Sequence, residues 1–262
     1  MRDGRSLVVN EFMVDSEPGI SIFVRNKHPA GMERFESAKT VVFVHGATYP
    51  SETSFDLALD GESWMDYIAR KGYDVYLLDV RGYGRSTRPP QMDKPAQDSL
   101  PFAQTEEAVR DVGAVVDFVR KRRGIEKVNL LAWSWGTMIM PSYASRNSDK
   151  VVKLALYAPL WLRQTPGSVL TGGAAGPLPA YRTETQEEAK ARWLAGVPDG
   201  KRASLIPPGW FETWASATWA TDPVGAQQNP PVLSLIGVIR PPRIGVYRPL
   251  EPTPRGVSND PV

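Results

Sequence analysis

The stretch Leu130-Leu131-Ala132-Trp133-Ser134-Trp135-Gly136 decides the fold of this chain. Its apolar start predicts a buried strand, and the residues from Gly136 to Arg146 predict a helix. Ser134 therefore occupies the turn between them, with the small residues Ala132 and Gly136 two positions to either side. Larger side chains at those positions would collide with neighbouring backbone, so the spacing predicts a nucleophile elbow with Ser134 as the catalytic nucleophile.

A second motif, Val44-His45-Gly46-Ala47-Thr48, follows an apolar run at 40–44. Its glycine lets the backbone turn an N–H group toward a substrate oxygen. We therefore expect the N–H groups of Ala47 and Trp135 to form an oxyanion hole, supported by His45, Gly46 and Gly136. Removing one such donor typically costs about 3 kcal/mol of transition-state stabilisation. His45 itself is expected to be structural.

Strands and helices alternate in the pattern from Thr40 to Pro159. Two antiparallel strands precede them, at Leu7–Val14 and Ile20–Arg25, with the turn Glu17-Pro18-Gly19 between. The alternation predicts an α/β fold with a mostly parallel, doubly wound sheet and helices on both faces. The expected strands are 40–44, 73–78, 127–133 and 151–157, and the expected helices are one capped by Asp60 and ending at Arg70, one at 106–123 capped by Thr105, and one at 136–146.

These motifs, together with the turn Asp79-Val80-Arg81-Gly82-Tyr83-Gly84-Arg85-Ser86, resemble the α/β-hydrolase superfamily over about Ser6 to Pro159. The resemblance implies that Ser134 attacks an acyl carbon, that a histidine acts as general base, and that an Asp or Glu orients this histidine. It also implies a small-molecule carboxylic ester or related acyl compound as substrate. No cofactor and no metal site are expected.

The general base and the acid that this resemblance implies cannot be assigned. The chain has two histidines, His28 and His45, and both precede Ser134, whereas the superfamily has its histidine after the serine. His28 is expected to be solvated in a polar turn at 25–29. Without a base, a serine hydroxyl is a poor nucleophile at neutral pH, because its proton has nowhere to go in the transition state.

The pattern divides the chain into an α/β-hydrolase core at 1–162, a helical cap at 163–228 and a Pro/Arg-rich tail at 229–262. The cap is expected to hold one helix at 184–194, opened by a capping box of Thr183 and Gln186, and another at 210–219. Eight of the last 34 residues are proline, and a strand is predicted at 232–237, so the C-terminal strands and helix of the fold are expected to be missing. Four tryptophans are candidate substrate-binding residues: Trp133, Trp161, Trp210 and Trp214. The alternative is that the aromatic residues pack the cap onto the sheet.

Three hypotheses address the absent histidine. In the first, the natural protein is a complete serine hydrolase and this chain is a shortened or frame-shifted product, as the change of composition near Asn229 indicates. In the second, the chain is a non-catalytic α/β-hydrolase-like protein that holds an apolar ligand. In the third, His45 serves as the base beside Ser134, although its backbone is needed for the oxyanion hole.

Composition excludes several classes of function. The chain has no cysteine, which excludes disulfides, thiolate metal sites and cysteine nucleophiles. The net charge is +2 with scattered basic residues, so no nucleic acid and no membrane is expected as a partner. A cytoplasmic location is expected because the N-terminal residues do not resemble a signal peptide. The oligomeric state is not predicted.

Overall fold

The computed structural model describes residues 4–159 and 179–236 and contains a six-stranded sheet with the strand order β1-β2-β4-β3-β5-β6. β1 and β2 are antiparallel to each other, and β2 is antiparallel to β4, whereas the remaining neighbours are parallel. The mostly parallel sheet is therefore confirmed. The strands are β1 (Leu7–Glu17), β2 (Ile20–Pro29), β3 (Thr40–Val44), β4 (Asp74–Leu78), β5 (Val128–Trp133) and β6 (Val151–Tyr157).

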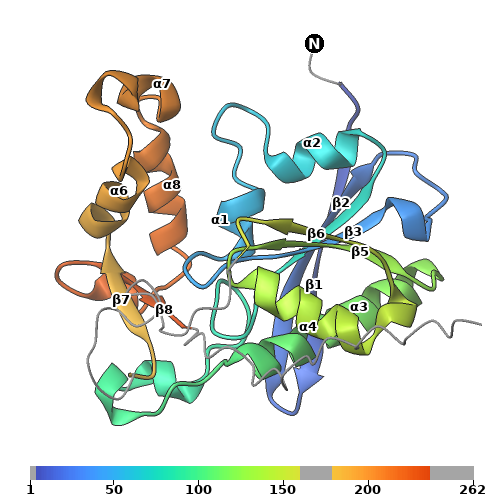
Figure 1. The fold of residues 1–262 in the computed structure, drawn as a ribbon, viewed down its shortest axis with the longest axis horizontal. Coiled ribbons are helices and arrows are strands. Elements are labelled where there is room, and N and C mark those ends of the chain that lie inside the picture. The colour runs from blue at the N-terminus through green and yellow to red at the C-terminus, as the bar shows by residue number, and fades with distance from the viewer. Residues whose placement is uncertain (1–3, 160–178, 237–262) are drawn as a thin grey trace, which may run out of the picture.

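Helices cover both faces of this sheet, as the alternation of strands and helices predicted (Figure 1). They are α1 (Ser51–Phe55), α2 (Trp64–Arg70), α3 (Thr105–Arg123) and α4 (Gly136–Arg146). Successive side chains of β3 point to opposite faces. Val42 and Val44 pack with the apolar faces of α3 and α4, whereas Phe43 packs with Phe55 of α1 and Met65 of α2. The central strands are continuously apolar because both of their faces are buried.

The segment 179–236 lies beside the sheet and contains three helices and two strands (Figure 1). The strands pair with each other in an antiparallel two-stranded sheet and not with the six-stranded sheet. An apolar cluster joins Phe211 and Trp214 of this segment to Tyr49, Leu57 and Leu59. The elements are β7 (Arg182–Thr185), α6 (Gln186–Leu194), α7 (Arg202–Leu205), α8 (Trp210–Trp219) and β8 (Val232–Leu235).

Short 3-10 helices connect several of these elements: Ser37–Lys39, Pro90–Asp93, Ala96–Asp98, Ser148–Lys150, Asp199–Lys201 and Gly225–Gln227. In the described parts of the chain, no helix is long and apolar enough to cross a membrane. The outer edge of β6 is not paired with any strand among the described residues.

All three predicted helix caps are wrong by a few residues. α2 is capped by Ser63 and not by Asp60. α3 begins at Thr105 itself, and the N–H of Gln104 donates to the Glu107 carboxylate at 2.7 Å. In each case the predicted cap lies within three residues of the true one.

At α6, the predicted capping box of Thr183 and Gln186 is wrong because Thr183 lies in β7. Thr185 caps α6 instead. Its hydroxyl accepts from the Glu188 N–H at 3.2 Å, while its own N–H donates to the Glu188 carboxylate at 2.8 Å. Strand pairing of 182–185 with β8 therefore moves the start of the helix.

The predicted solvated turn around His28 is also wrong. β2 continues through His28 to Pro29, which pairs with Leu7, and His28 is only 8% exposed. The sequence pattern did not predict this part of the strand because its residues are polar. Such residues can be buried when they form hydrogen bonds with a partner. Asn26, for example, is fully buried and donates to Asp74 at 2.7 Å.

Candidate active site

Ser134 lies in a strained turn between β5 and α4. Its φ is +52°, in the left-handed region, which costs a residue other than glycine roughly 1–2 kcal/mol. Backbone and side-chain hydrogen bonds hold this turn, among them one from the Thr137 hydroxyl to the Ser134 carbonyl oxygen at 2.5 Å. The Ser134 N–H donates to the carbonyl oxygen of Tyr157 in β6 at 3.1 Å, and the Thr137 N–H donates to the Ser134 carbonyl oxygen at 2.9 Å. Strain that the surrounding fold maintains is typical of functional positions.

Two glycines let the backbone close around Ser134. A Cβ atom at Gly46 would lie 2.9 Å from the Ser134 Cβ atom and 3.3 Å from its Oγ atom. A Cβ atom at Gly136 would lie 2.9 Å from the carbonyl oxygens of Val44 and His45. The spacing seen in the sequence thus has a steric cause, and the end of β3 lies directly against the serine.

The two residues expected to form the oxyanion hole flank this contact. Ala47 follows Gly46 in the loop after β3, and Trp135 precedes the first residue of α4. Trp135 is fully buried, and its indole N–H donates to the Thr105 hydroxyl at 3.1 Å, which anchors the start of α4. Within residues 4–159 and 179–236, neither the Ala47 nor the Trp135 backbone N–H donates to an acceptor. The oxyanion hole remains a prediction.

His45 is fully buried and bonded to backbone at both ring nitrogens. Nε2 accepts from the Val80 N–H at 3.0 Å, and Nδ1 donates to the Gly46 carbonyl oxygen at 2.6 Å. Burial lowers the pKa of His45 to about 4. The ring is therefore neutral at neutral pH, and taking up a proton on Nε2 would break the bond to Val80. This geometry favours a structural role over that of a general base.

Asp79 is a buried carboxylate that holds the loops around the site. It accepts from the Ser51 N–H at 2.7 Å and from the Arg85 N–H at 3.4 Å. Burial raises its pKa to about 7. A Cβ atom at Gly84 would lie 2.0 Å from the Asp79 carboxylate, so glycine is required where this loop passes it.

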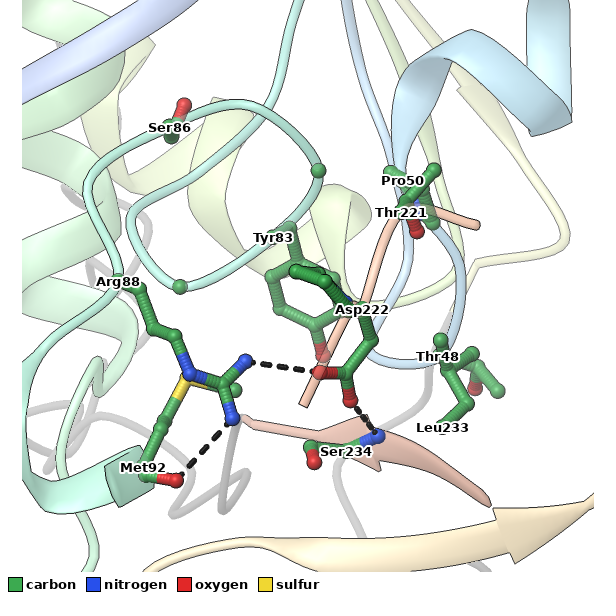
Figure 2. Close-up of a pocket in the computed structure, with 13 residues that line it drawn as sticks. Thr48, Pro50, Tyr83, Ser86, Arg88, Met92, Thr221, Asp222, Leu233 and Ser234 are labelled. Atoms are coloured by element: carbon green, nitrogen blue, oxygen red, sulfur yellow. Dashed lines mark hydrogen bonds and ion pairs between the residues drawn. The ribbon is translucent and has the colours of Figure 1, made fainter. Parts of the chain in front are cut away.

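Among the described residues, no hydrogen bond joins Ser134 to a carboxylate that follows it in the chain. Asp222 lines a separate cavity of 130 Å³, in which it accepts from Arg88 at 3.0 Å and from the Ser234 N–H at 2.7 Å (Figure 2). The Gly225 N–H also donates to it, at 3.0 Å. Asp199 is exposed, with 88% of its side chain accessible. Asp260 lies outside the described residues.

A larger cavity of 710 Å³ lies between the ends of β5 and β6, α1 and the helices α6 and α8. Of the four candidate substrate-binding tryptophans, Trp133 and Trp214 line it. Trp210 does not line it, although it shares a helix with Trp214, and Trp161 lies outside the described residues. The rest of its aromatic wall was not predicted: Tyr49, Phe55, Trp64, Tyr157 and Trp193.

A family model described as alpha/beta hydrolase fold matches residues 39–229. The chain belongs to the α/β-hydrolase family. The match includes Gly46, Ser134 and Gly136, so the glycines packed around the serine lie within the part of the chain that is shared with this family.

Individual relatives match over shorter stretches. Human gastric triacylglycerol lipase is 28% identical over 131 residues, which cover 49% of this chain and 33% of that protein. Human lipase member N is 28% identical over 145 residues, 52% of this chain and 36% of the relative. This α/β hydrolase thus spans about a third of the length of these curated relatives.

Solved structures of epoxide hydrolases are also similar to this chain. A Vigna radiata epoxide hydrolase mutant is 20% identical, with a TM-score of 0.43, over 60% of this chain and 41% of that chain. Potato (Solanum tuberosum) epoxide hydrolase I is 24% identical, with a TM-score of 0.43, over 63% and 44%.

The cavity residues that sequence reasoning missed come from separate elements of this α/β hydrolase. Tyr157 ends β6, Trp64 begins α2, and Trp193 lies near the end of α6. One signal was available, because the strand ends of an open α/β sheet meet at one edge and Tyr157 ends the strand beside β5. No comparable signal marked Trp64 or Trp193.

Proposed function

We propose that this chain carries the nucleophile and oxyanion-hole half of a serine hydrolase that acts on a carboxylic ester or related acyl substrate. The observation that carries the proposal is the left-handed turn at Ser134, packed against Gly46. Membership of the α/β-hydrolase family and relatives named as lipases support this class of reaction.

In this mechanism the Ser134 Oγ atom attacks the acyl carbon, and the carbonyl oxygen becomes an oxyanion. The N–H groups of Ala47 and Trp135 donate to that oxygen and stabilise its charge. The hydroxyl proton must leave as the bond forms. His45 cannot take it while Nε2 accepts from Val80, and the chain has no histidine after Ser134. Turnover is therefore impaired, with a residual acceleration of about 10³–10⁴ over water from the oxyanion hole and binding.

Rescue by an added base tests this proposal. Labelling of the purified chain by a fluorophosphonate should be slow, located at Ser134 by mass spectrometry, and accelerated by imidazole in proportion to its concentration. Ser134→Ala should give no adduct at this position, and Ser145→Ala, in exposed surface of α4, should label like the parent. A folded parent chain that forms no adduct at Ser134, with or without imidazole, would contradict the proposal.

The second candidate is a binding protein that holds an apolar ligand without converting it. The two histidines that precede Ser134 and the 710 Å³ aromatic cavity favour it. It predicts tight ligand binding together with no imidazole-dependent adduct. The labelling experiment therefore separates the two functions.

The change of composition after Asn229 supports a shifted reading frame as the reason for the absent base. Eight of the residues from 229 to 262 are proline. Translating the other two frames of the encoding DNA from the codon of Asn229 tests this explanation. A strand followed by an Asp or Glu, and then a histidine, is expected in one of them. If both frames lack this order, the explanation is wrong.

A further inference from the structure

The loop that is expected to supply one oxyanion donor makes few hydrogen bonds of its own. Among the described residues, no backbone–backbone hydrogen bond involves Gly46, Ala47 or Thr48. The Gly46 carbonyl oxygen accepts from the Nδ1 atom of the neighbouring His45 ring. The Ala47 carbonyl oxygen accepts from the Arg182 guanidinium at 3.3 Å. Arg182 thus anchors this loop from a distant part of the chain.

Arg182 is the first residue of β7, and other contacts fix the position of this strand. Two residues earlier, the Ala180 N–H donates to the Ala96 carbonyl oxygen at 2.8 Å. Within the two-stranded sheet, Arg182 pairs with Leu235, which is 1% exposed and belongs to the apolar cluster around Trp214. These contacts hold the backbone from which the guanidinium reaches the loop.

The charge of Arg182 is not neutralised by an ion pair within residues 4–159 and 179–236. Glu184, two positions along the same strand, pairs with Arg192 at 2.5 Å instead. Arg202, another arginine of this segment, pairs with Asp199 at 2.9 Å. Arg182 is nevertheless partly buried. A charge held partly away from water without an ion pair costs free energy, which favours a role for Arg182 other than stability.

The positive charge of Arg182 acts on a buried group beside the loop. The ring centroid of Tyr83 lies 4.5 Å from that of His45, the residue that precedes Gly46. Burial raises the pKa of Tyr83, and the charge of Arg182 opposes this rise. The guanidinium is therefore close enough to the interior beside the loop to influence it electrostatically.

The loop lies against the serine, because a Cβ atom at Gly46 would be 2.9 Å from the Ser134 Cβ atom. An oxyanion donor is effective only when its N–H points at the developing charge, and a displacement of about 1 Å can lower a rate by about 10². Glycine makes this loop flexible. A hydrogen bond to the Ala47 carbonyl oxygen restrains the residue whose N–H is the expected donor.

We propose that Arg182 is a positioning residue for the oxyanion hole. Its guanidinium holds the loop at Ala47, and its charge raises the positive potential where the oxyanion forms. Resting on the proposed function of Ser134, this role brings β7 into the reaction. The segment 179–236 then contributes to the rate through Arg182, in addition to lining the 710 Å³ cavity.

Saturation kinetics of fluorophosphonate labelling, at a fixed imidazole concentration, test this role. They separate the dissociation constant of the reagent from the first-order rate constant of its reaction with Ser134. Arg182→Met keeps an apolar stem but removes the donor and the charge, so the rate constant should fall about tenfold, as for the loss of one charged hydrogen bond. The dissociation constant should stay within about twofold. Arg182→Lys keeps a charge and a donor and should stay within about threefold of the parent rate constant.

Hydrogen–deuterium exchange of the unlabelled chains gives a second measure that needs no chemistry. The amides of residues 46–48 should exchange about tenfold faster in Arg182→Met than in the parent, because the loop has lost its anchor. The amides of β5 should exchange at the parent rate. Arg202→Met is the matched control, because it makes the same change in the same segment at an arginine whose side chain is 48% exposed. It should leave labelling and exchange unchanged.

In a parent chain that labels at Ser134, an unchanged rate constant in folded Arg182→Met would overturn the proposal, even if the dissociation constant rises. If Arg182→Met does not fold by circular dichroism, Arg182→Gln replaces it and should react more slowly than Arg182→Lys. Failure of the hydrolase function gives a different result. The parent then forms no adduct, with or without imidazole, whereas exchange at residues 46–48 is still faster in Arg182→Met. The anchor of the loop then stands and the proposed reaction does not.

Discussion

The 130 Å³ cavity around Asp222 and the 710 Å³ cavity lined by Trp133 and Trp214 differ in how the polar residues of their walls are bonded. In the small cavity, the Asp222 carboxylate accepts three hydrogen bonds, and the Ser86 hydroxyl donates to Asp79 and accepts from Phe23. In the large cavity, the hydroxyls of Thr53 and Ser54 have no partner among the described residues. Polar groups that are paired stabilise the fold, whereas buried polar groups without a partner destabilise it.

The largest effect is expected from Asp222→Ala. This change leaves the Arg88 guanidinium without its buried partner and two N–H groups unbonded, so the free energy of unfolding should fall by about 3–5 kcal/mol in urea titrations. Asp93→Ala is the matched control, because Asp93 also pairs with Arg88 but its side chain is 63% exposed. It should cost about 1 kcal/mol or less. Equal costs would show that the small cavity is not held by its buried pair.

Asp79 links the two cavities, since it accepts from Ser51 at the start of α1 and from Arg85 in the loop that lines the small cavity. Because its pKa is raised from 3.8 to about 7, the folded protein binds a proton that the unfolded chain has lost. The stability that this carboxyl contributes is thus complete below pH 3.8 and is lost as the pH rises to about 7.

Asp79→Asn should remove this pH dependence. Between pH 4 and pH 7 the parent chain should lose roughly 2–4 kcal/mol relative to the variant, measured by urea denaturation at each pH. His45 acts in the opposite direction, because its pKa is lowered to about 4 and its contribution grows as the pH rises through that value. Because His45 is present in both proteins, its contribution to stability cancels in the difference between parent and variant. A difference that does not change with pH would contradict a raised pKa at Asp79.

A smaller loss is expected from Ser86→Ala. The Ser86 hydroxyl accepts from the Phe23 N–H at 2.8 Å and donates to the Asp79 carbonyl oxygen at 2.6 Å. Removing it leaves both groups buried and unbonded, at a cost of about 1–3 kcal/mol in thermal or chemical unfolding. An unchanged stability would mean that water takes over both bonds.

The smallest effect, of opposite sign, is expected from Thr53→Val. This change removes a buried hydroxyl that has no partner, so the unliganded chain should become more stable by up to about 1 kcal/mol. Thr105→Val is the contrasting control, because the Thr105 hydroxyl accepts from the Trp135 indole, and it should be destabilising. A loss of stability in Thr53→Val would show that its hydroxyl is bonded, and the comparison of the cavities would fail.

Much of this fold was predictable from short stretches of sequence. The apolar runs of β3, β4 and β5 stand out because both faces of these strands are buried, and the interior of α3 is marked by valines on one face. The ends of elements were less predictable. Ser63 and Asp60, or Thr185 and Thr183, are chemically similar capping residues, and at α6 the pairing of β7 with β8 decides which threonine begins the helix.

The candidate site likewise has a part that the sequence predicted and a part that it did not. The steric demand of the turn marks Ser134, Gly136 and Gly46 in the sequence, because side chains larger than hydrogen are excluded at both glycines. The cavity wall has no such local cause. Trp193 and Tyr157 contribute to it only because α6 and β6 pack at one end of the sheet, which depends on tertiary contacts between residues far apart in the chain.

The hydrogen bond from the Ser134 N–H to the Tyr157 carbonyl oxygen has a consequence for synthesis. The ribosome adds Tyr157 after Ser134, and β6 must emerge and pair with β5 before this bond forms. A nascent chain that has not reached Tyr157 therefore lacks one of the hydrogen bonds that hold the serine in its left-handed conformation. The turn at Ser134 therefore reaches its final conformation after β6, which follows it in the chain, has paired with β5.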